Sequence, residues 1–383
     1  MGQFAVTTGC KDMVLLYPLR FEEILKEKIW GGRRLADLFG KPLPPDALIG
    51  ESWEISDREG DQSVVADGPL KGATLHELTV QHGERLVGKA ALAKGRFPLL
   101  FKIIDAGQRL SVQVHPGDEL AIRYNEPDPG KTEMWYVLAA EDGAQLMLGL
   151  QPGVGKQEFR EAAEAGRLEQ QLNYVTVKAG DAFFLPAGSV HAIGAGIVLA
   201  EIQENSDLTY RVYDWGRVGA DGKPRELHLD KALTAIDFDV PCLQRTGGVT
   251  VTEGDNSRTV LAACRYFATE IVDVAASYAA ECTGHTFTIV FFVQGSPRLL
   301  WEGGELEVRV GESLLIPAEL LEWRVEGPSR FLKFYVPDLI EDIVKSLAER
   351  GISARRIKEL GGDPVEGDVA AALSRWEAAR ESP

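Results

Sequence analysis

A short stretch near residue 110 places polar side chains at alternate positions. The sequence LSVQVHPGDE, residues 110–119, alternates apolar and polar residues before a Pro-Gly pair, which predicts a half-buried β-strand that ends in a turn. Side chains two residues apart on a strand point to the same face, so we expect Ser111, Gln113 and His115 to lie side by side. A polar, solvent-facing strand is the plain interpretation, and half of a metal site is the sharper one.

Two of the six histidines, His115 and His191, each follow a predicted strand at a turn. The segment Gly180-x5-Pro186-x-Gly188-x2-His191 resembles the second half of the cupin signature, whose first half is a strand with two ligands followed by a carboxylate. The resemblance implies that Gln113, His115, Glu133 and His191 hold one metal ion per chain. Such a set of nitrogen and oxygen donors suits Zn²⁺ and leaves room for water or substrate.

Many short apolar runs, most of them closed by Gly, Pro or Asp-Gly, follow one another between residues 97 and 215. This rhythm is typical of an all-β sandwich or jelly roll. A second β-rich block extends from about residue 265 to 337, and amphipathic helices rich in Ala, Glu and Arg follow it. For residues 29–67 we expect packed loops and short strands, because Gly and Pro are dense there.

An internal repeat connects the two β-rich blocks. GDAFFLPAGSVH (180–191) and GESLLIPAELLE (311–322) share one frame, and the first ends in His191 where the second has Glu322. We therefore predict a mainly β protein with two cupin-type jelly-roll domains, of which only the first retains its chemistry, with peripheral helices and a helical C-terminal appendage. The predicted domains are a catalytic cupin domain with the metal site, a degenerate cupin-like domain and a helical extension: 13–236, 237–337 and 338–383.

Composition excludes several classes of partner. The formal net charge of −17 argues against a nucleic-acid-binding surface, which needs a basic face. No stretch approaches the roughly 20 apolar residues that a membrane helix needs, so we expect no membrane partner. The four cysteines are scattered and form no C-x-x-C pair, which indicates reduced thiols and predicts a cytoplasmic location.

Two departures from the general cupin pattern point to one family. Gln113 stands where a histidine is usual, and Glu133 lies unusually far from His115 along the chain. With IWGG, GESWEISD, FPLLFKIIDAGQRLSVQVHPGDELA, GKTEMWYVL, PAGSVHAIG and EIQENSDLTYRVYDWGR, the sequence resembles the type I phosphomannose isomerases of the short bacterial kind over residues 13–337. The resemblance implies a zinc-dependent aldose–ketose isomerase that interconverts mannose 6-phosphate and fructose 6-phosphate through an enediol.

The same resemblance makes Arg211 an active-site residue. An arginine stays protonated and cannot act as a base, so we expect Arg211 to stabilise the enediolate by charge-assisted hydrogen bonds. Lys131, two residues before Glu133, is a hypothetical general base, and a charged lysine that binds substrate or solvent is an equal alternative. Ser111 and Lys102 are our candidates for binding the sugar phosphate.

Two other functions remain open at this stage. A metal-dependent cupin oxygenase would use the same fold, although such enzymes more often keep a histidine where Gln113 stands. A non-catalytic sugar-phosphate-binding protein would need no intact chemistry, yet the four ligands, Arg211 and Lys131 are all present. A small-molecule sugar phosphate is the expected partner, and the oligomeric state is left open.

Overall fold

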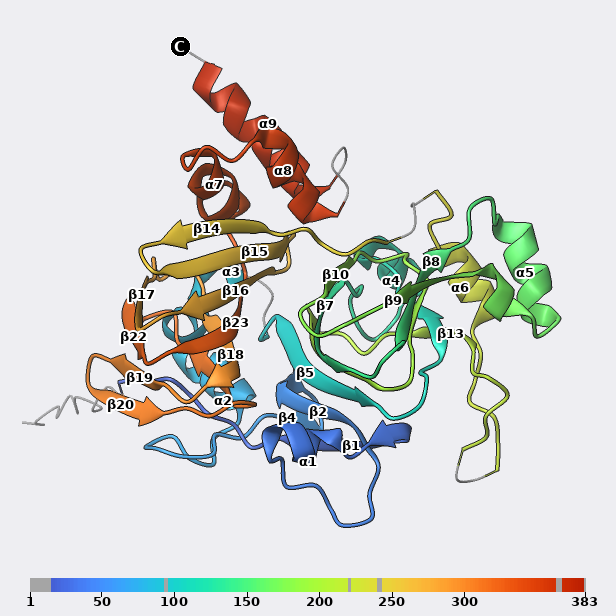
Figure 1. Ribbon diagram of the computed structural model, residues 1–383, viewed down its shortest axis with the longest axis horizontal. Helices are drawn as coiled ribbons and strands as arrows, with labels where there is room; N and C mark the ends of the chain where they lie inside the picture. The colour runs from blue at the N-terminus through green and yellow to red at the C-terminus, as the bar shows by residue number, and fades with distance from the viewer. Residues whose placement is uncertain (1–14, 93–95, 220–221, 240–242, 363–366, 382–383) are drawn as a thin grey trace, which may run out of the picture.

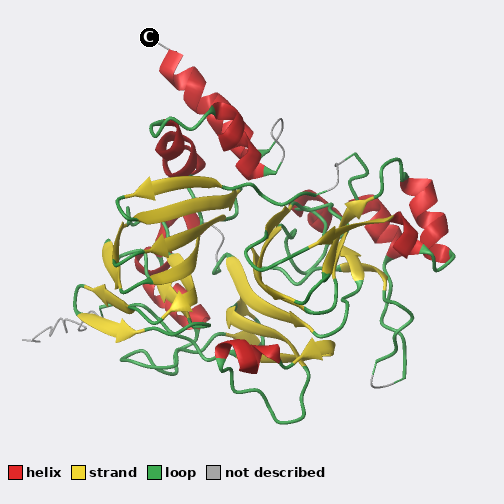
Figure 2. Ribbon diagram, in the orientation of Figure 1, coloured by secondary structure: helices red, strands yellow, loops and turns green. Residues whose placement is uncertain are grey.

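Two β units stand side by side in the computed structural model, each with one six-stranded sheet and one smaller sheet (Figure 1). The structure describes residues 15–92, 96–219, 222–239, 243–362 and 367–381. Strands dominate and helices lie at the periphery (Figure 2), which confirms the mainly β, cupin-type fold. In these described ranges no helix is long and apolar enough to cross a membrane. Cys264 and Cys282 are free thiols, whereas Cys10 and Cys242 lie outside the described residues.

The first unit contains the run of short strands expected between residues 97 and 215. All strand pairs are antiparallel. The six-stranded sheet has the order β1 (Ile24–Gly32), β2 (Ile49–Ile55), β5 (Leu99–Ala106), β12 (Ile197–Glu204), β7 (Glu133–Ala140) and β10 (Ala182–Leu185). The facing sheet has the order β13 (Tyr210–Tyr213), β6 (Val112–Val114), β11 (His191–Ile193), β8 (Gln145–Leu150) and β9 (Leu172–Thr176).

Residues 29–67 are more regular than we expected. β2 is a full seven-residue strand, buried along its whole length, and β1 pairs with it. A two-stranded hairpin, β3 (Asp57–Arg58) and β4 (Asp61–Gln62), follows. The Gly and Pro content misled us because glycines here allow close backbone contact: a Cβ at Gly31 would lie 2.6 Å from the Gly50 nitrogen.

The second unit repeats the strand order of the first. Its six-stranded sheet has the order β14 (Val249–Glu253), β15 (Asn256–Ala263), β16 (Ala268–Val274), β23 (Ser329–Tyr335), β18 (Thr288–Gly295) and β21 (Ser313–Ile316). The facing four-stranded sheet has the order β17 (Ser277–Glu281), β22 (Glu322–Glu326), β19 (Arg298–Trp301) and β20 (Gly304–Glu307). The two copies of the sequence repeat form β10 and β21, each at the same edge of its sheet, which supports the interpretation of two related barrels.

Short helices surround and join the two units. They are α1 (Arg34–Phe39), α2 (Leu75–His82), α3 (Glu84–Leu92), α4 (Asp118–Arg123), α5 (Lys156–Glu164), α6 (Leu229–Ala235) and the 3₁₀ turn η1 (Leu168–Gln171). Thr74 begins α2 with the expected capping box to Glu77. One apolar cluster contains Phe101 of the first unit and Phe291 of the second, so the two units share a core. We keep the predicted boundaries at 236/237 and 337/338 as a proposal.

A helical C-terminal segment covers the second unit, as expected. It contains η2 (Leu339–Lys345, π-helical), α7 (Ser346–Ala348), α8 (Ala354–Lys358), the 3₁₀ turn η3 (Glu359–Gly361) and α9 (Asp368–Glu381). Figure 1 shows these helices beside β14 and β15. Ile343, Leu347 and Leu373 pack there against Val249 and Val260, because burial of this apolar face stabilises helices too short to be stable alone.

Candidate metal centre

The antiparallel pairing of β6 with β11 brings two of the expected ligands together. His191 is the first residue of β11 and lies directly opposite Gln113 in the register. Side chains opposite each other in an antiparallel pair are close neighbours, and Gln113 Nε2 lies 3.3 Å from His191 Nε2. The Pro-Gly turn before His191 ends the preceding strand and reverses the chain, so the imidazole faces the barrel interior.

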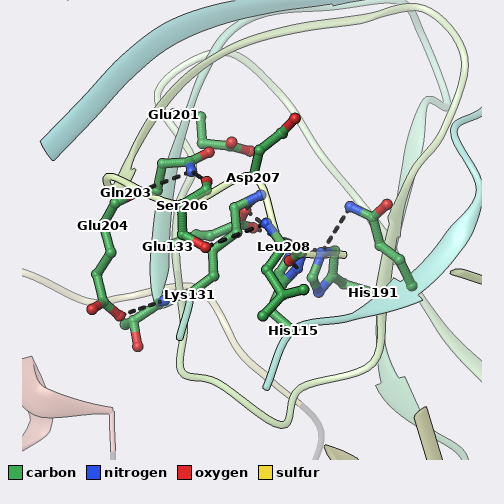
Figure 3. Close-up of polar contacts among 12 residues, drawn as sticks. His115, Lys131, Glu133, His191, Glu201, Gln203, Glu204, Ser206, Asp207 and Leu208 are labelled. Carbon is green, nitrogen blue, oxygen red and sulfur yellow. Dashed lines mark hydrogen bonds and ion pairs between the residues drawn. The ribbon is translucent and has the colours of Figure 1, made fainter. Parts of the chain in front are cut away.

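His115 and Glu133 complete this cluster from the turn after β6 and from the facing sheet. His115 Nε2 lies 3.3 Å from Glu133 Oε1, and His191 Nε2 lies 3.7 Å from Glu133 Oε2. The two imidazole rings are 4.9 Å apart between centroids. Figure 3 shows the three side chains directed toward a common point. Among the described residues, this is the group whose three His or acidic ligand atoms all lie within 4.8 Å of one another.

Backbone carbonyls fix the orientation of both imidazoles. His115 Nδ1 lies 2.7 Å from the Leu208 carbonyl and His191 Nδ1 lies 2.9 Å from the Ser189 carbonyl, so each Nδ1 carries the proton and donates. Burial, and then the charge of Lys131, lower the pKa of His115 to about 4, and burial also lowers the pKa of His191. Both rings are therefore neutral near pH 7 and present Nε2 lone pairs, the state in which histidine binds metal.

Several buried polar atoms in this cluster have unsatisfied hydrogen-bonding capacity. His115 Nε2 and both carboxylate oxygens of Glu133 are buried without an aligned hydrogen-bond donor, although Lys131 Nζ forms an ion pair with Glu133 Oε1 at 2.6 Å. Burial would raise the pKa of Glu133, but Lys131, His115 and His191 together outweigh it and hold that pKa well below its usual range. An ionised carboxylate beside two neutral imidazoles fits a divalent metal ion.

A cavity of about 240 Å³ opens beside the metal cluster, and it contains the other residues expected from the sequence. Ser111, Gln113, Lys131, Lys102 and Arg211 all line it. Ser111 Oγ accepts a hydrogen bond from Arg211 Nε at 3.3 Å and lies 3.5 Å from Gln113 Oε1. One polar row therefore connects the metal cluster with Arg211.

Arg211 is held at the mouth of this cavity by the chain that follows it. Its Nη1 donates to the Glu226 carbonyl at 3.2 Å, and its backbone N–H donates to His228 Nδ1 at 3.2 Å. His228 therefore supports the strand that carries Arg211. Burial, and then the nearby Arg225, lower the pKa of Arg211, which indicates an environment with room for an anion.

Lys102 is buried more deeply and is already paired. Its Nζ lies 2.9 Å from Glu201 Oε1, and Glu201 Oε2 accepts a hydrogen bond from Trp135 Nε1 at 2.7 Å. Although burial opposes its charge, Glu201 and then Glu51 raise the pKa of Lys102, so the ammonium stays charged. Burial, and then Glu133, raise the pKa of Glu201.

Glu51 and Glu201 are cavity residues that the sequence analysis missed. Glu51 lies on β2 and Glu201 lies on β12, and both line the cavity. Lys102 is a charged residue inside the apolar strand LLFKII, and Glu201 in IVLAEIQE has the same signal. Lys131 precedes β7 rather than lying on it, yet its ammonium reaches the cavity that we expected.

The fold and the cluster together define a cupin protein with a candidate metal site. Residues 19–137 match the family model of the type I phosphomannose isomerase catalytic domain, and residues 256–336 match that of the mannose-6-phosphate isomerase cupin domain. The chain is 39% identical over 311 residues to mannose-6-phosphate isomerase ManA of Bacillus subtilis, covering 81% of this chain and 96% of that protein. It is 36% identical to mannose-6-phosphate isomerase of Streptococcus mutans, over 81% and 95% of the two chains.

Solved structures agree with this result. The crystal structure of the Bacillus subtilis mannose 6-phosphate isomerase matches with a TM-score of 0.76 and 32% identity, covering 83% of this chain and 99% of that one. A putative mannosephosphate isomerase from Archaeoglobus fulgidus matches with a TM-score of 0.66 and 25% identity, covering 83% and 97%. The chain therefore belongs to the type I phosphomannose isomerase family and is an enzyme of that family, as its sequence motifs predicted.

Proposed function

We propose that this enzyme interconverts mannose 6-phosphate and fructose 6-phosphate with one Zn²⁺ per chain, through an enediol intermediate. The observation that carries the proposal is the buried cluster of His115, Glu133 and His191 beside a polar cavity. The relatives named above as mannose-6-phosphate isomerases support the choice of substrate. The free thiols among the described residues favour a cytoplasmic location.

Gln113, His115, Glu133 and His191 would hold the zinc ion. His115 and His191 have neutral Nε2 atoms, and Glu133 is ionised. Gln113 now presents its amide nitrogen to His191, and rotation of the amide by about 180° brings its oxygen into the same place, since the two atoms are nearly isosteric. Zinc supplies Lewis acidity toward sugar oxygens when it is bound.

Two cationic side chains have separate roles in the proposed reaction. The isomerisation removes the C2 proton of the aldose and returns a proton to C1, while charge develops on the enediolate oxygens. Arg211 faces the cavity with a guanidinium that cannot lose its proton, so it stabilises that charge. Lys131 lies 2.6 Å from Glu133 and, once it has given up its own proton to become a neutral amine, is our proposed group for taking the proton from C2 and returning one to C1.

The charge of the cavity suits a phosphorylated sugar. Its lining has five cationic side chains against three carboxylates (Lys28, Lys102, Lys131, Arg211 and Arg225 against Glu51, Glu201 and Asp207). This excess of positive charge stands out in a protein with a net charge of −17. We propose that Ser111 and Lys102 contact the substrate. Because the Lys102 charge is balanced by Glu201, Arg211 contributes more of the net attraction for the phosphate.

The proposed reaction can be tested with a coupled assay of the conversion of mannose 6-phosphate to fructose 6-phosphate, made before chelation, after it, and after zinc is restored. We expect activity to vanish and return. The Lys131→Met variant should lose at least about 100-fold in kcat, whereas Lys156→Met, at an exposed lysine on α5, should match the wild type. A zinc-loaded protein with no conversion would reject this reaction, and full turnover in Lys131→Met would reject the proton-transfer role.

A further inference from the structure

The second β unit has a cavity of its own at the position that corresponds to the first. This cavity has a volume of about 220 Å³ and lies between β15, β16, β23, β18 and the end of β17. In the first unit the corresponding strands β2, β5, β12 and β6, with Lys131 just before β7, line the cavity of about 240 Å³. The equal strand order of the two six-stranded sheets allows each residue to be matched by its register.

The central charges of the two cavities are reversed. Lys102 of β5 lies opposite Glu201 of β12, and at the matching place Glu270 of β16 lies opposite Lys333 of β23. Each of these ladders places the acid and the base on the same wall of its cavity. On β2, Glu51 lies two residues before the residue that pairs with Lys102. On β15, Arg258 lies two residues before the residue that pairs with Glu270. The acid Glu51 of the first unit therefore corresponds to the base Arg258 of the second. These matched groups are (Glu51, Lys102, Glu201) and (Arg258, Glu270, Lys333).

The metal ligands are absent from the second cavity. On β7, Glu133 pairs with the last residue of β10. On β18, the residue that pairs with the last residue of β21 is Thr288, so Thr288 corresponds to Glu133. Gln113 lies opposite His191, and the matching pair in the second unit is Glu281 and Glu322. Hydroxyl groups of Thr283, Thr286, Thr288 and Ser346 line the cavity instead.

Thr288 has a hydroxyl in this cavity that lacks a partner. The residue is only 4% exposed, and no hydrogen bond joins its side chain to any other described residue. Thr288 Oγ1 is not among the fully buried unpaired atoms of the described residues, so it is open to the cavity and free to bond to a molecule there. A ligand hydroxyl in the cavity would satisfy it.

The charges around the cavity exclude an anionic ligand. Glu270 is fully buried and accepts from Arg258 at 2.7 Å and from the Tyr335 hydroxyl at 2.8 Å, with Lys333 Nζ at 3.4 Å. Both cations of the lining are therefore already paired, and four carboxylates outnumber them (Glu270, Glu281, Glu341 and Asp342). The described carboxylates here do not converge as three metal ligands would, so a metal ion is disfavoured as well.

We propose that the second unit binds one uncharged polyhydroxyl compound, a free sugar or a polyol, between Thr288 and the C-terminal segment. The paired charges offer both donors and acceptors to ligand hydroxyls, and the threonine and serine hydroxyls add groups that do either. Glu341, Asp342 and Ser346 of η2 and α7 form the outer wall of the cavity. The C-terminal segment therefore closes this second site.

Isothermal titration calorimetry with D-mannose, D-fructose and D-mannitol tests the proposal on the full zinc-loaded chain. An equilibrated, saturating mixture of mannose 6-phosphate and fructose 6-phosphate fills the first cavity during the titration, and only this step rests on the proposed function. We expect at least one probe to bind once per chain. Binding that disappears when the phosphates are present would place the probe in the first cavity and overturn the proposal.

Variants of Thr288 make the test specific to the second cavity. Thr288→Val removes the hydroxyl at nearly constant volume and should weaken binding by about tenfold or more, while Thr288→Ser keeps the hydroxyl and should bind as the wild type does. Thr269→Val is the matched control, because Thr269 of β16 has a hydroxyl that is buried and unpaired but does not line the cavity. Isomerase activity should be unchanged in all three.

Two results would overturn the inference. One is that none of the three probes binds more tightly than about 10 mM. The other is that Thr288→Val, folded and active, binds the probe as tightly as the wild type does. Absence of isomerase activity in the wild type would instead refute the proposed function, and the binding results with the Thr288 variants would still test the second site.

Discussion

The buried pair of Lys131 and Glu133 allows a quantitative test of the metal centre. Both side chains are at most 4% exposed, and their charged atoms lie 2.6 Å apart. Glu133→Gln removes the carboxylate charge and leaves the ammonium of Lys131 buried without its nearest anion. Breaking a buried ion pair in this way costs about 3–5 kcal/mol, so the metal-free variant should lose about 3 kcal/mol in its free energy of unfolding.

A double-mutant cycle separates this pair from other effects of the substitution. Adding Lys131→Met to Glu133→Gln removes the orphaned charge and should recover about 2 kcal/mol. Urea denaturation of the four metal-free proteins gives the coupling energy. The same substitutions at Lys345 and Glu341, an exposed pair at 2.7 Å, are the matched control and should show no resolvable coupling. A coupling energy near zero for the buried pair would refute the electrostatic argument.

Zinc extends the same experiment to the ligand role of Glu133. A metal that binds only the folded state raises the free energy of unfolding by about 4 kcal/mol at 1,000 times its dissociation constant. The wild type should show this increment, whereas Glu133→Gln should lose most of it because a neutral amide is a weaker ligand than a carboxylate. Equal zinc increments in the two proteins would contradict the assignment of Glu133 as a ligand.

Three further outcomes follow from the structure. Arg211→Lys should lower kcat about 100-fold; unchanged kcat in the coupled assay would contradict its role. Burial lowers the pKa of His115 from 6.5 to about 4, so the unfolded chain gains a proton before the folded protein does as pH falls. The free energy of unfolding of the metal-free protein should therefore decrease by about 3 kcal/mol between pH 6.5 and 4. In urea titrations, His115→Gln should flatten this pH dependence. Glu270→Gln should destabilise by about 3 kcal/mol, since it removes the buried carboxylate that pairs with both Arg258 and Lys333; stability equal to wild type would refute this.

Local sequence patterns indicated Gln113, His115 and His191 as candidate metal ligands, because strand alternation and turns involve only a few neighbouring residues. Alternation placed Gln113 and His115 on one face, and the Pro-Gly turn placed His191 at a strand start. The position of Glu133 came from a family resemblance, and the structure brings it within 3.3 Å of His115 Nε2. Zinc as the metal and the roles of Arg211 and Lys131 remain proposals for the experiments above.

Charges inside apolar strands were harder to interpret from the sequence. Lys102 was noticed, but its partner Glu201 lies 99 positions away and meets it only through the β5–β12 register. Glu51 was missed because its strand lies in a segment rich in glycine, which we expected to be irregular. A sequence pattern predicts which face of a strand a residue occupies, but it does not predict which residue of the neighbouring strand pairs with it.

The sequence by itself determined the strand rhythm, the repeat and the helical C-terminal segment, because alternation and turns are local properties. Only the tertiary structure decided which acid meets which base, that the two units share one core, and that the second unit keeps a cavity with its charges reversed. Those features depend on the register between strands far apart in the chain, which is fixed by packing of the whole barrel.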